Sequence, residues 1–563
     1  MQVWFELKMP DYMSKVTVLV QTEGSKMSEI LKNGGYMLMC AFASLVGAVI
    51  VGYLIALFAS GFSRNLRSKL FRKVEDMSMS EVKEFSPNSL ITRTTNDITQ
   101  VEMFIGFGLQ LLIKAPITAV WAITKILNKS WEWSMVTAVA VVILLLVIGI
   151  LTIIVMPKFK IVQKLTDKLN EVTRENLMGI RVVRAFNAEE YQQEKFQNVN
   201  NSLTNLQLFN QKAMSIMAPV MYLVMYMLTL VIYFIGAYLI KDALMADKIG
   251  LFGDMVVFSS YAMQIIMSFL MLAMIFMILP RAQVSASRIN EVLDTRLSVI
   301  DGNVTNKDEV GTVEFRNVSF KYPDAEEYVL RNISFKANKG DTVAFIGSTG
   351  SGKSTLVNLI VRFYDVTDGE ILIDGVNIKD YKLEYLYKLI GYVPQRAVLF
   401  NETVNSNIRY GEAMEEISDK KIVEAARVAQ ADEFISKMDD GYESHIAQGG
   451  TNVSGGQKQR LAIARAIAKN PEIYIFDDSF SALDYKTDAV LRSELKKYTK
   501  DATSLIVAQR IGTIMNADKI IVLDNGESVG VGTHKELLKS CEVYKQIALS
   551  QLSKEELDNA KAK

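Results

Sequence analysis

The sequence predicts a multi-domain protein, with an all-α transmembrane helical domain followed by an α/β domain. Its 563 residues are 50% apolar, so the chain is longer and more hydrophobic than one soluble domain. The formal net charge of zero conceals a division, because residues 1–300 hold 28 Lys and Arg against 22 Asp and Glu, while residues 301–563 hold 34 against 40. Long charge-free apolar runs occur in the first part, and strand-like runs alternate with helical patterns in the second.

Domain boundaries follow from the same shift in composition. We expect the transmembrane domain at residues 1–290, a linker at 291–312, the α/β domain at 313–550 and a polar C-terminal tail at 551–563. The chain has two cysteines, Cys40 and Cys541, and two histidines, His445 and His534. A disulfide framework and a metal centre built from several cysteines or histidines are therefore excluded.

Five segments are apolar and long enough to cross a bilayer, for which about 20 residues suffice. The clearest contains the run AVAVVILLLVIGILTIIVM, which has no charged residue. The five predicted spans are Tyr36–Phe62, Phe104–Leu127, Trp133–Val155, Ala213–Ile240 and Leu251–Pro280.

The extreme N-terminus is apolar but contains Glu6, Lys8 and Pro10, so by itself it is too short and too charged to span. It also lacks the basic start, apolar core and cleavage site of a secretory signal. We expect it to be a partial first span.

The basic residues of the connecting segments predict the orientation. Ser63–Glu102 carries seven Lys and Arg and Lys158–Lys212 carries nine, whereas Asn128–Glu132 carries one and Lys241–Gly250 two. Both long loops, and the chain after Pro280, are therefore expected in the cytoplasm. Apolar residues at helical spacing in these loops predict that the membrane helices continue there.

The α/β domain contains a phosphate-binding loop. Directly after the apolar run DTVAFIG comes a segment that fits G-x-x-x-x-G-K-[ST], namely Gly347-Ser348-Thr349-Gly350-Ser351-Gly352-Lys353-Ser354-Thr355. The glycines let backbone amides surround phosphates, and the following helix directs its positive end at the anion. We expect Lys353 to reach the β- and γ-phosphates and Ser354 to bind Mg²⁺. The domain is therefore predicted to be a P-loop NTPase.

A carboxylate at the end of a second buried strand completes the predicted metal site. The run IYIFDD places Asp477 after four apolar or aromatic residues. With a phosphate loop in the same domain, such a carboxylate typically holds Mg²⁺ through water.

The segment Thr451-Asn452-Val453-Ser454-Gly455-Gly456-Gln457 lies between these two motifs and resembles the signature of ATP-binding-cassette (ABC) proteins. The resemblance covers nearly the whole chain, whose motif order is similar to that of type IV, multidrug-type half-size exporters. It implies a cofactor of ATP with Mg²⁺, an ATPase activity coupled to transport, and six membrane helices per subunit. MQVWFELKMPDYM then resembles the outer half of the first helix, which suggests a start assigned too late or a shortened product.

The resemblance also implies roles for single residues. Tyr322 matches the aromatic residue that stacks on adenine, and Gln395 matches the glutamine that touches Mg²⁺ and relays to the membrane helices. Ser454, Gly455, Gly456 and Gln457 match the segment that clamps the γ-phosphate bound to the other cassette of a dimer. Ser481–Asp484 matches the loop through which the two sites communicate.

Two departures from the family pattern affect the predicted catalytic residues, which are Asp478, Gln509 and Lys353. The family has glutamate after the Mg²⁺ aspartate, but this chain has Asp478, whose carboxylate is about 1.5 Å shorter in reach. The family has histidine in the switch strand, but this chain has Gln509, which cannot carry a proton or a positive charge. Both changes are expected to weaken hydrolysis and preserve binding.

We therefore expect a heterodimer with a second ABC half-transporter. This chain would contribute a weakly hydrolytic pocket and an intact signature that completes the partner's pocket. The other interpretation of the two departures is neutral drift with full activity.

In the membrane half, the resemblance places two cytoplasmic coupling helices near Leu90–Thr99 and at Phe186–Phe196. Lys114 is expected at the inner interface, where its chain can extend to water, or in a substrate cavity. The last two predicted spans are rich in methionine, which suits either a cavity for varied apolar substrates or packing against lipid.

The leading function is thus an ATP-driven exporter subunit of the cell membrane, with a cytoplasmic nucleotide-binding domain and a hydrophobic or amphipathic small-molecule substrate. The alternative is an ATP-gated channel or a regulatory ABC membrane protein. The predicted spans exclude a soluble cassette protein, and no nucleic-acid partner is expected. An importer is disfavoured because the membrane and cassette halves are fused.

Overall fold

The computed structural model describes residues 1–563 except 128–129, 246, 308–309, 412–416 and 553–563. The predicted C-terminal tail thus lies almost entirely outside the described residues. The chain forms two compact units. The membrane unit comprises residues 1–72 and 91–294, and the cassette unit comprises residues 73–90 and 295–563.

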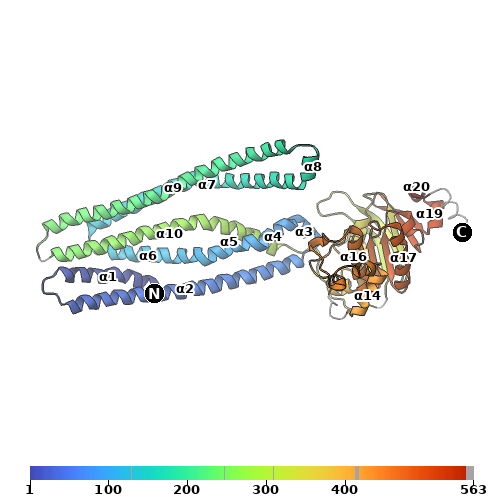
Figure 1. The fold of residues 1–563 in the computed structure, drawn as a ribbon, viewed down its shortest axis with the longest axis horizontal. Helices are drawn as coiled ribbons and strands as arrows, with labels where there is room; N and C mark the ends of the chain where they lie inside the picture. The colour runs from blue at the N-terminus through green and yellow to red at the C-terminus, as the bar shows by residue number, and fades with distance from the viewer. Residues whose placement is uncertain (128–129, 246, 308–309, 412–416, 553–563) are drawn as a thin grey trace. The chain divides into compact units, whose positions relative to one another are not determined.

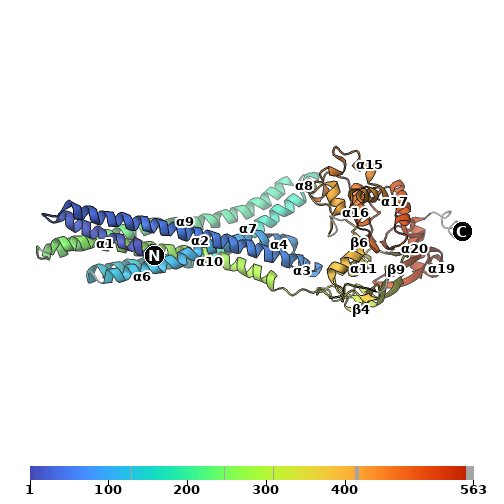
Figure 2. The same cartoon turned by 90° about the horizontal axis from the view of Figure 1, so that it is seen from below.

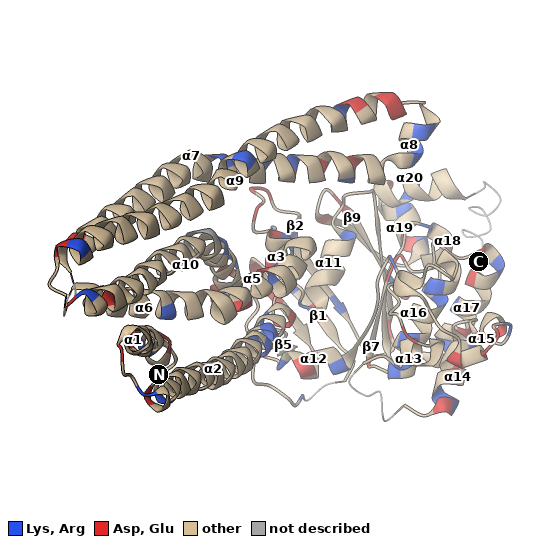
Figure 3. Cartoon of the chain, turned by 60° about the vertical axis from the view of Figure 1, so that its left-hand side comes forward, with Lys and Arg blue, Asp and Glu red and all other residues tan. Residues whose placement is uncertain are grey.

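Long helices build the membrane unit. Among the described residues, five helical segments are long and apolar enough to cross a membrane, which confirms the predicted number. They are 27–75, 87–127, 131–178, 189–242 and 248–294. Figure 3 shows that charged residues concentrate toward the ends of these helices. The elements are α1 (Gln2–Gln21), α2 (Met27–Glu75), α4 (Pro87–Thr92), the π-helical η1 (Arg93–Asp97), α5 (Ile98–Met103), the π-helical η2 (Phe104–Gly108), α6 (Leu109–Leu127), α7 (Trp131–Met178), α8 (Ile180–Ala185), α9 (Glu189–Asp242) and α10 (Lys248–Asp294).

Packing between these helices pairs α7 with α9 and α10 with α6, as Figure 1 and Figure 2 both show. The indole of Trp133 is buried and donates a hydrogen bond to the carbonyl of Ile232 at 3.1 Å. Gly236 leaves room for the side chain of Met255, whose sulfur would lie 2.4 Å from a Cβ at that position. A small residue therefore lets α9 and α10 approach closely.

Helix α1 is stabilised by polar partners on its neighbours. It continues through Pro10 and packs against α10 and α6. Lys114 pairs with Glu6 at 3.1 Å and Lys125 with Asp11 at 2.7 Å. The sequence did not indicate this partner for Lys114, whose position at the inner interface or in a cavity stays a prediction. Pairing offsets the high cost of placing separate charges in an apolar environment.

Short helices lie at both long turns between the membrane helices. At the first turn, α3 (Met79–Phe85) begins at a capping box formed by Ser78 and Glu81 and is followed by α4, which overlaps the predicted coupling segment near Leu90–Thr99. At the second turn, α8 is followed by residues 186–188 and α9 begins at Glu189, so this turn lies inside the predicted segment Phe186–Phe196. Their role as coupling helices stays a prediction.

The cassette unit contains two sheets. The smaller has the strand order β2-β1-β4-β5, and the larger has the order β10-β9-β3-β8-β7-β6 with parallel pairing from β9 to β6. This confirms the predicted α/β domain. The strands are β1 (Val313–Phe320), β2 (Leu330–Ala337), β3 (Thr342–Gly347), β4 (Asp368–Ile373), β5 (Val376–Asn377), β6 (Ile390–Val393), β7 (Ile473–Asp477), β8 (Thr503–Val507), β9 (Lys519–Asp524) and β10 (Glu527–Gly532).

Helices and short 3-10 turns flank these sheets. They are α11 (Lys353–Ile360), α12 (Leu383–Leu389), α13 (Val404–Arg409), α14 (Asp419–Val428), α15 (Asp432–Ile435), η3 (Gly441–Glu443), η4 (Gln448–Gly450), α16 (Gly455–Lys469), α17 (Tyr485–Tyr498), α18 (Ile511–Ile514), α19 (His534–Ser540) and α20 (Glu542–Gln551).

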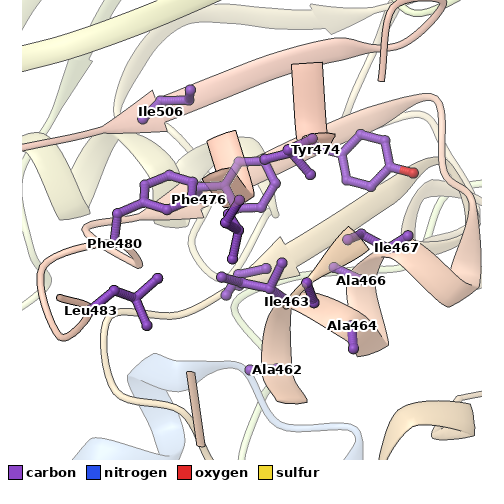
Figure 4. Close-up of a cluster of buried hydrophobic side chains, with 14 of the residues drawn as sticks. Ala462, Ile463, Ala464, Ala466, Ile467, Tyr474, Phe476, Phe480, Leu483 and Ile506 are labelled. Carbon is purple, nitrogen blue, oxygen red and sulfur yellow. The ribbon is translucent and has the colours of Figure 1, made fainter. Parts of the chain in front are cut away.

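A continuous apolar core holds the central strands in place. β7 and β8 are buried at every residue, since both faces of the sheet are covered. Figure 4 shows part of this core, where Phe476 of β7 lies among Ile463 of α16, Phe480 and Ile506. Because β3, β8, β7 and β6 are parallel neighbours, their carboxyl ends meet at one edge of the sheet. The polar residues after these strands gather there.

Candidate functional site

The phosphate loop connects β3 to α11, and its glycines are required by its geometry. Gly350 and Gly352 have φ angles of +85° and +93°, which side chains other than glycine rarely adopt. A Cβ on Gly352 would also lie 2.6 Å from Cδ2 of Leu330. A Cβ on Gly347 would lie 2.0 Å from the carbonyl oxygen of Leu523. The loop therefore packs closely against Leu330 and Leu523, whereas Ser348–Gly350 are exposed.

Lys353 folds back over this loop. Its ammonium donates hydrogen bonds to the carbonyls of Gly347 at 2.9 Å and Ser348 at 2.7 Å, and to the hydroxyl of Ser351 at 3.3 Å. Burial lowers the pKa of Lys353, and the nearby carboxylates of Asp478 and Asp477 oppose that shift. A positive charge held at the mouth of the loop favours an anion there.

Ser354 and Asp477 come together as the sequence predicted for a metal site. The Ser354 hydroxyl donates to Oδ1 of Asp477 at 3.2 Å across the gap between α11 and β7. Asp477 is 4% exposed, and burial raises its pKa, while Ser354 and Lys353 act in the opposite direction. A buried carboxylate beside a hydroxyl supplies the oxygen donors that Mg²⁺ prefers.

Asp478, the next residue, is held by two amides. Gln395 and Gln509 both donate through Nε2 to its Oδ2 oxygen, at 3.3 Å and 2.8 Å. Burial raises the pKa of Asp478, opposed by hydrogen bonds and by the charges of Lys353 and Arg510. Asp478 also has a φ of +47°, so its backbone adopts a left-handed conformation. The carboxylate is therefore fixed in place by neutral donors on both sides.

The predicted base platform, Tyr322, lies beside the same loop. Its hydroxyl shares a hydrogen bond of 3.0 Å with the hydroxyl of Thr355 in the first turn of α11. Phe320 and Tyr364 contact its ring edge to face, with ring centres 5.0 Å and 5.3 Å away. These contacts hold the aromatic ring next to the phosphate loop.

The signature residues form a separate group. Ser454 caps α16, and its backbone amide donates to Gln457 at 2.8 Å in a capping box. Gly455 and Ser454 are exposed, and a Cβ on Gly456 would lie 3.3 Å from the carbonyl oxygen of Ala482. Within the described residues, the hydrogen bonds of Ser454 and Gln457 stay inside this helix start. Among the described residues, the bonds of these two side chains therefore do not join the signature to the phosphate loop of its own chain.

The contact between Gln509 and Asp478 was not foreseen from the sequence. Each residue was singled out alone, but their contact depends on β8 lying beside β7. The only sequence signal was that each follows a buried apolar run. Nor did the motifs indicate Thr355 as the partner of Tyr322.

Comparison with known proteins agrees with this architecture. The family described as ABC transporter transmembrane region matches residues 1–269, and the family described as ABC transporter matches residues 330–481. An uncharacterized ABC transporter ATP-binding protein of Mycobacterium tuberculosis is 41% identical over 523 residues, which cover 92% of this chain and 87% of that protein.

The chain belongs to the ABC transporter family. A further ABC transporter ATP-binding protein, from Bacillus subtilis, is 36% identical, with 90% of each chain covered. An ATP-dependent lipid A-core flippase of Haemophilus influenzae is 32% identical, covering 91% of this chain and 89% of the flippase. A solved bacterial Atm1-family ABC exporter with ATP bound has the same fold, with a TM-score of 0.83 at 24% identity over 98% of this chain and 97% of that one.

Together, the comparisons and the fold establish the class of this transporter and its location in the cell. It has the fold of an ABC exporter and an ATP-binding ATPase domain that is coupled to transport. It is a multi-pass membrane protein, and its ATPase domain is cytoplasmic.

Proposed function

We propose that this transporter is one subunit of a heterodimeric exporter for lipids or other amphipathic molecules. Its own ATP site hydrolyses slowly, and its signature completes the competent site of a second half-transporter. The observation that carries this proposal is the position of Asp478, whose Oδ2 accepts hydrogen bonds from both Gln395 and Gln509.

The geometry around Asp478 supports the proposal of slow hydrolysis. A general base must accept a proton from water at hydrogen-bond distance, and its efficiency depends on its reach and its pKa. In this site the carboxylate is short, and one of its oxygens is occupied by two amides. Gln509 lies where a histidine would offer a positive charge to a γ-phosphate, and its amide can only donate a neutral hydrogen bond.

ATP binding is proposed to use the intact part of the site. Tyr322 supports the base, residues 347–355 surround the phosphates, and Lys353 contacts the β- and γ-phosphates. Ser354, Asp477 and the side-chain oxygen of Gln395 would hold Mg²⁺, and their donor set fits that ion. When bound, Mg²⁺ neutralises charge on the phosphate oxygens.

The exposed signature supports a dimeric arrangement. Ser454 and Gly455 lie at the start of α16, where backbone amides and the helix dipole favour an anion. Because the described hydrogen bonds of Ser454 and Gln457 do not join the signature to the chain's own phosphate loop, the proposed ligand is ATP bound to the partner subunit. The partner would supply the glutamate and histidine that this chain lacks.

An apolar cleft among α7, α9 and α10 supports a lipid-like substrate. Its volume is about 50 Å³, and Thr152 provides the only hydroxyl among the described residues that line it. Relatives of this chain include lipid A-core flippases. Two of the methionines singled out in the sequence, Met214 and Met217, lie in its wall, whereas Met267 and Met274 are exposed. The cleft residues are Ile148, Leu151, Thr152, Val155, Met156, Phe159, Met214, Met217 and Ala273.

Reconstitution of the chain alone, and then with a candidate partner, tests the proposal. The chain alone should bind ATP but hydrolyse it slowly, and co-reconstitution should produce ATP-dependent movement of a fluorescent phospholipid between leaflets. Lys353→Ala should reduce ATP binding at this site. Fast hydrolysis by the chain alone would contradict the heterodimer, and ATP-gated flux without hydrolysis would indicate a channel instead.

A further inference from the structure

The short helix α3 belongs to the cassette unit, although its sequence lies between two membrane helices. Glu81 anchors it. One carboxylate oxygen accepts from the amide of Ser78 at 2.7 Å, and the other accepts from the amide of Ser298 at 3.1 Å. The hydroxyls of Ser78 and Ser298 share a further hydrogen bond of 2.9 Å. Glu81 is 4% exposed, so α3 is held firmly against the segment that follows α10.

This anchoring brings Lys83 to the base platform. The ammonium of Lys83 lies 5.5 Å from the centre of the Tyr322 ring. The ring is itself fixed through its hydroxyl to Thr355 and by its edge contact with Tyr364. A cation within about 6 Å of an aromatic ring centre is attracted to its π electrons. Lys83 thus adds a third restraint on the ring, from an element far away in the sequence.

We propose that Lys83 is a positioning residue of the nucleotide site, and that it strengthens binding of the base through Tyr322. This inference rests on the proposed role of Tyr322 as the adenine platform. Because the ammonium lies over the ring, 5.5 Å from its centre, it helps to hold the ring in the position that a stacking base requires.

The consequence is a physical link between base binding and α3. Glu81 joins α3 to Ser298, and Lys83 joins α3 to Tyr322, so a base on Tyr322 stabilises the position of both. Only a ligand with a base engages this link, because the phosphates are bound by the loop at residues 347–355.

Equilibrium binding to the full-length transporter in detergent tests the proposal. Lys83→Met should weaken binding of a fluorescent ATP analogue two- to fivefold, which corresponds to about 0.5–1 kcal/mol for an exposed cation–π contact. Binding of inorganic tripolyphosphate, measured by competition, should be unchanged because it has no base. Lys83→Arg should restore ATP binding, since a guanidinium also contacts an aromatic ring.

Lys321→Met is the matched control. Lys321 is adjacent to Tyr322 in the sequence, but its ammonium lies 5.9 Å from the ring of Tyr328. Lys321→Met removes one positive charge and one cation–π contact, as Lys83→Met does. ATP binding by this control should nevertheless equal that of the unmodified protein.

Tyr322→Ala separates the two proposals. If it leaves ATP binding unchanged, Tyr322 is not the base platform and both assignments fail. If Tyr322→Ala weakens ATP binding but Lys83→Met does not, the inference about Lys83 alone is overturned. If Lys83→Met weakens the binding of ATP and of tripolyphosphate equally, the inference is likewise overturned. The effect would then come from attraction between the lysine charge and the phosphates, not from the base.

Discussion

Asp478→Glu should increase the ATPase rate of this chain in the absence of any partner. The backbone at this position is fixed, since the Asp478 amide donates to the carbonyl of Val507 at 3.0 Å and its carbonyl accepts from the Ser481 hydroxyl at 2.9 Å. An added methylene therefore moves the carboxylate outward by about 1.5 Å. The carboxylate would then lie beyond the position at which its Oδ2 oxygen accepts hydrogen bonds from both Gln395 and Gln509.

The size of the gain follows from the usual contribution of a general base. Such a group accelerates a reaction by about 10²–10⁴-fold, which is about 2.7–5.4 kcal/mol of activation free energy. Because Gln509 would still lack a positive charge, we expect an increase at or below the lower end of this range, about 10- to 100-fold. The φ of +47° suits aspartate better than glutamate, so the variant should also lose up to about 1 kcal/mol of stability.

The assay is steady-state phosphate release by purified protein in lipid nanodiscs, at saturating ATP and Mg²⁺. Asp478→Asn is the control, because it keeps the side-chain size but removes the base, and its rate should stay within about twofold of the low starting rate. Our explanation of slow hydrolysis would be refuted if Asp478→Asn abolished a fast starting rate, or if Asp478→Glu gave no increase while ATP binding was retained.

Three further predictions concern other parts of the chain. Gly352→Ala should reduce binding of fluorescent ATP more than tenfold (about 1.4 kcal/mol or more), since its φ is +93° and a Cβ would clash with a leucine side chain. Tyr261→Phe removes hydrogen bonds of 2.7 Å to Asp11 and 2.8 Å to a backbone carbonyl, so it should cost about 1–3 kcal/mol and lower the unfolding midpoint in detergent by several degrees, whereas the exposed Tyr226→Phe should not. Burial lowers the pKa of His534, so its contribution to stability is full above pH 6.5 and declines as the pH falls below that value, because the unfolded chain takes up the proton first. The unfolding midpoint should therefore fall between pH 7.5 and 5.5, with a smaller fall in His534→Phe, and an equal fall in both would exclude this histidine as the cause.

Local sequence was sufficient for the membrane spans and the phosphate loop. Each of the five spans is a continuous stretch whose length and low content of charged residues suffice to predict it. The loop at residues 347–355 is also continuous, and its glycines, Lys353 and Ser354 act within a few residues of one another. The Ser354–Asp477 contact was predictable as well, because two motifs of one known type of site imply it.

Helix ends were predicted less well. A turn region was predicted near Leu90–Thr99, and the structure places the break a few residues earlier, between the end of α3 at Phe85 and the start of α4 at Pro87. Capping residues are short signals that also occur in loops, so the pattern of apolar residues alone did not locate the helix start.

Composition, apolar runs and contiguous motifs thus determined five membrane spans and a nucleotide-binding domain, and the resemblance of the signature and of the motif order indicated the ABC family. Only the tertiary structure decided that Glu6 neutralises Lys114, that Gln509 holds Asp478, and that Lys83 lies over the ring of Tyr322. Each of these contacts joins residues from different elements, 31 to 239 positions apart in the chain. Their formation depends on which strands and helices pack side by side, and that arrangement is set by burial of the whole core.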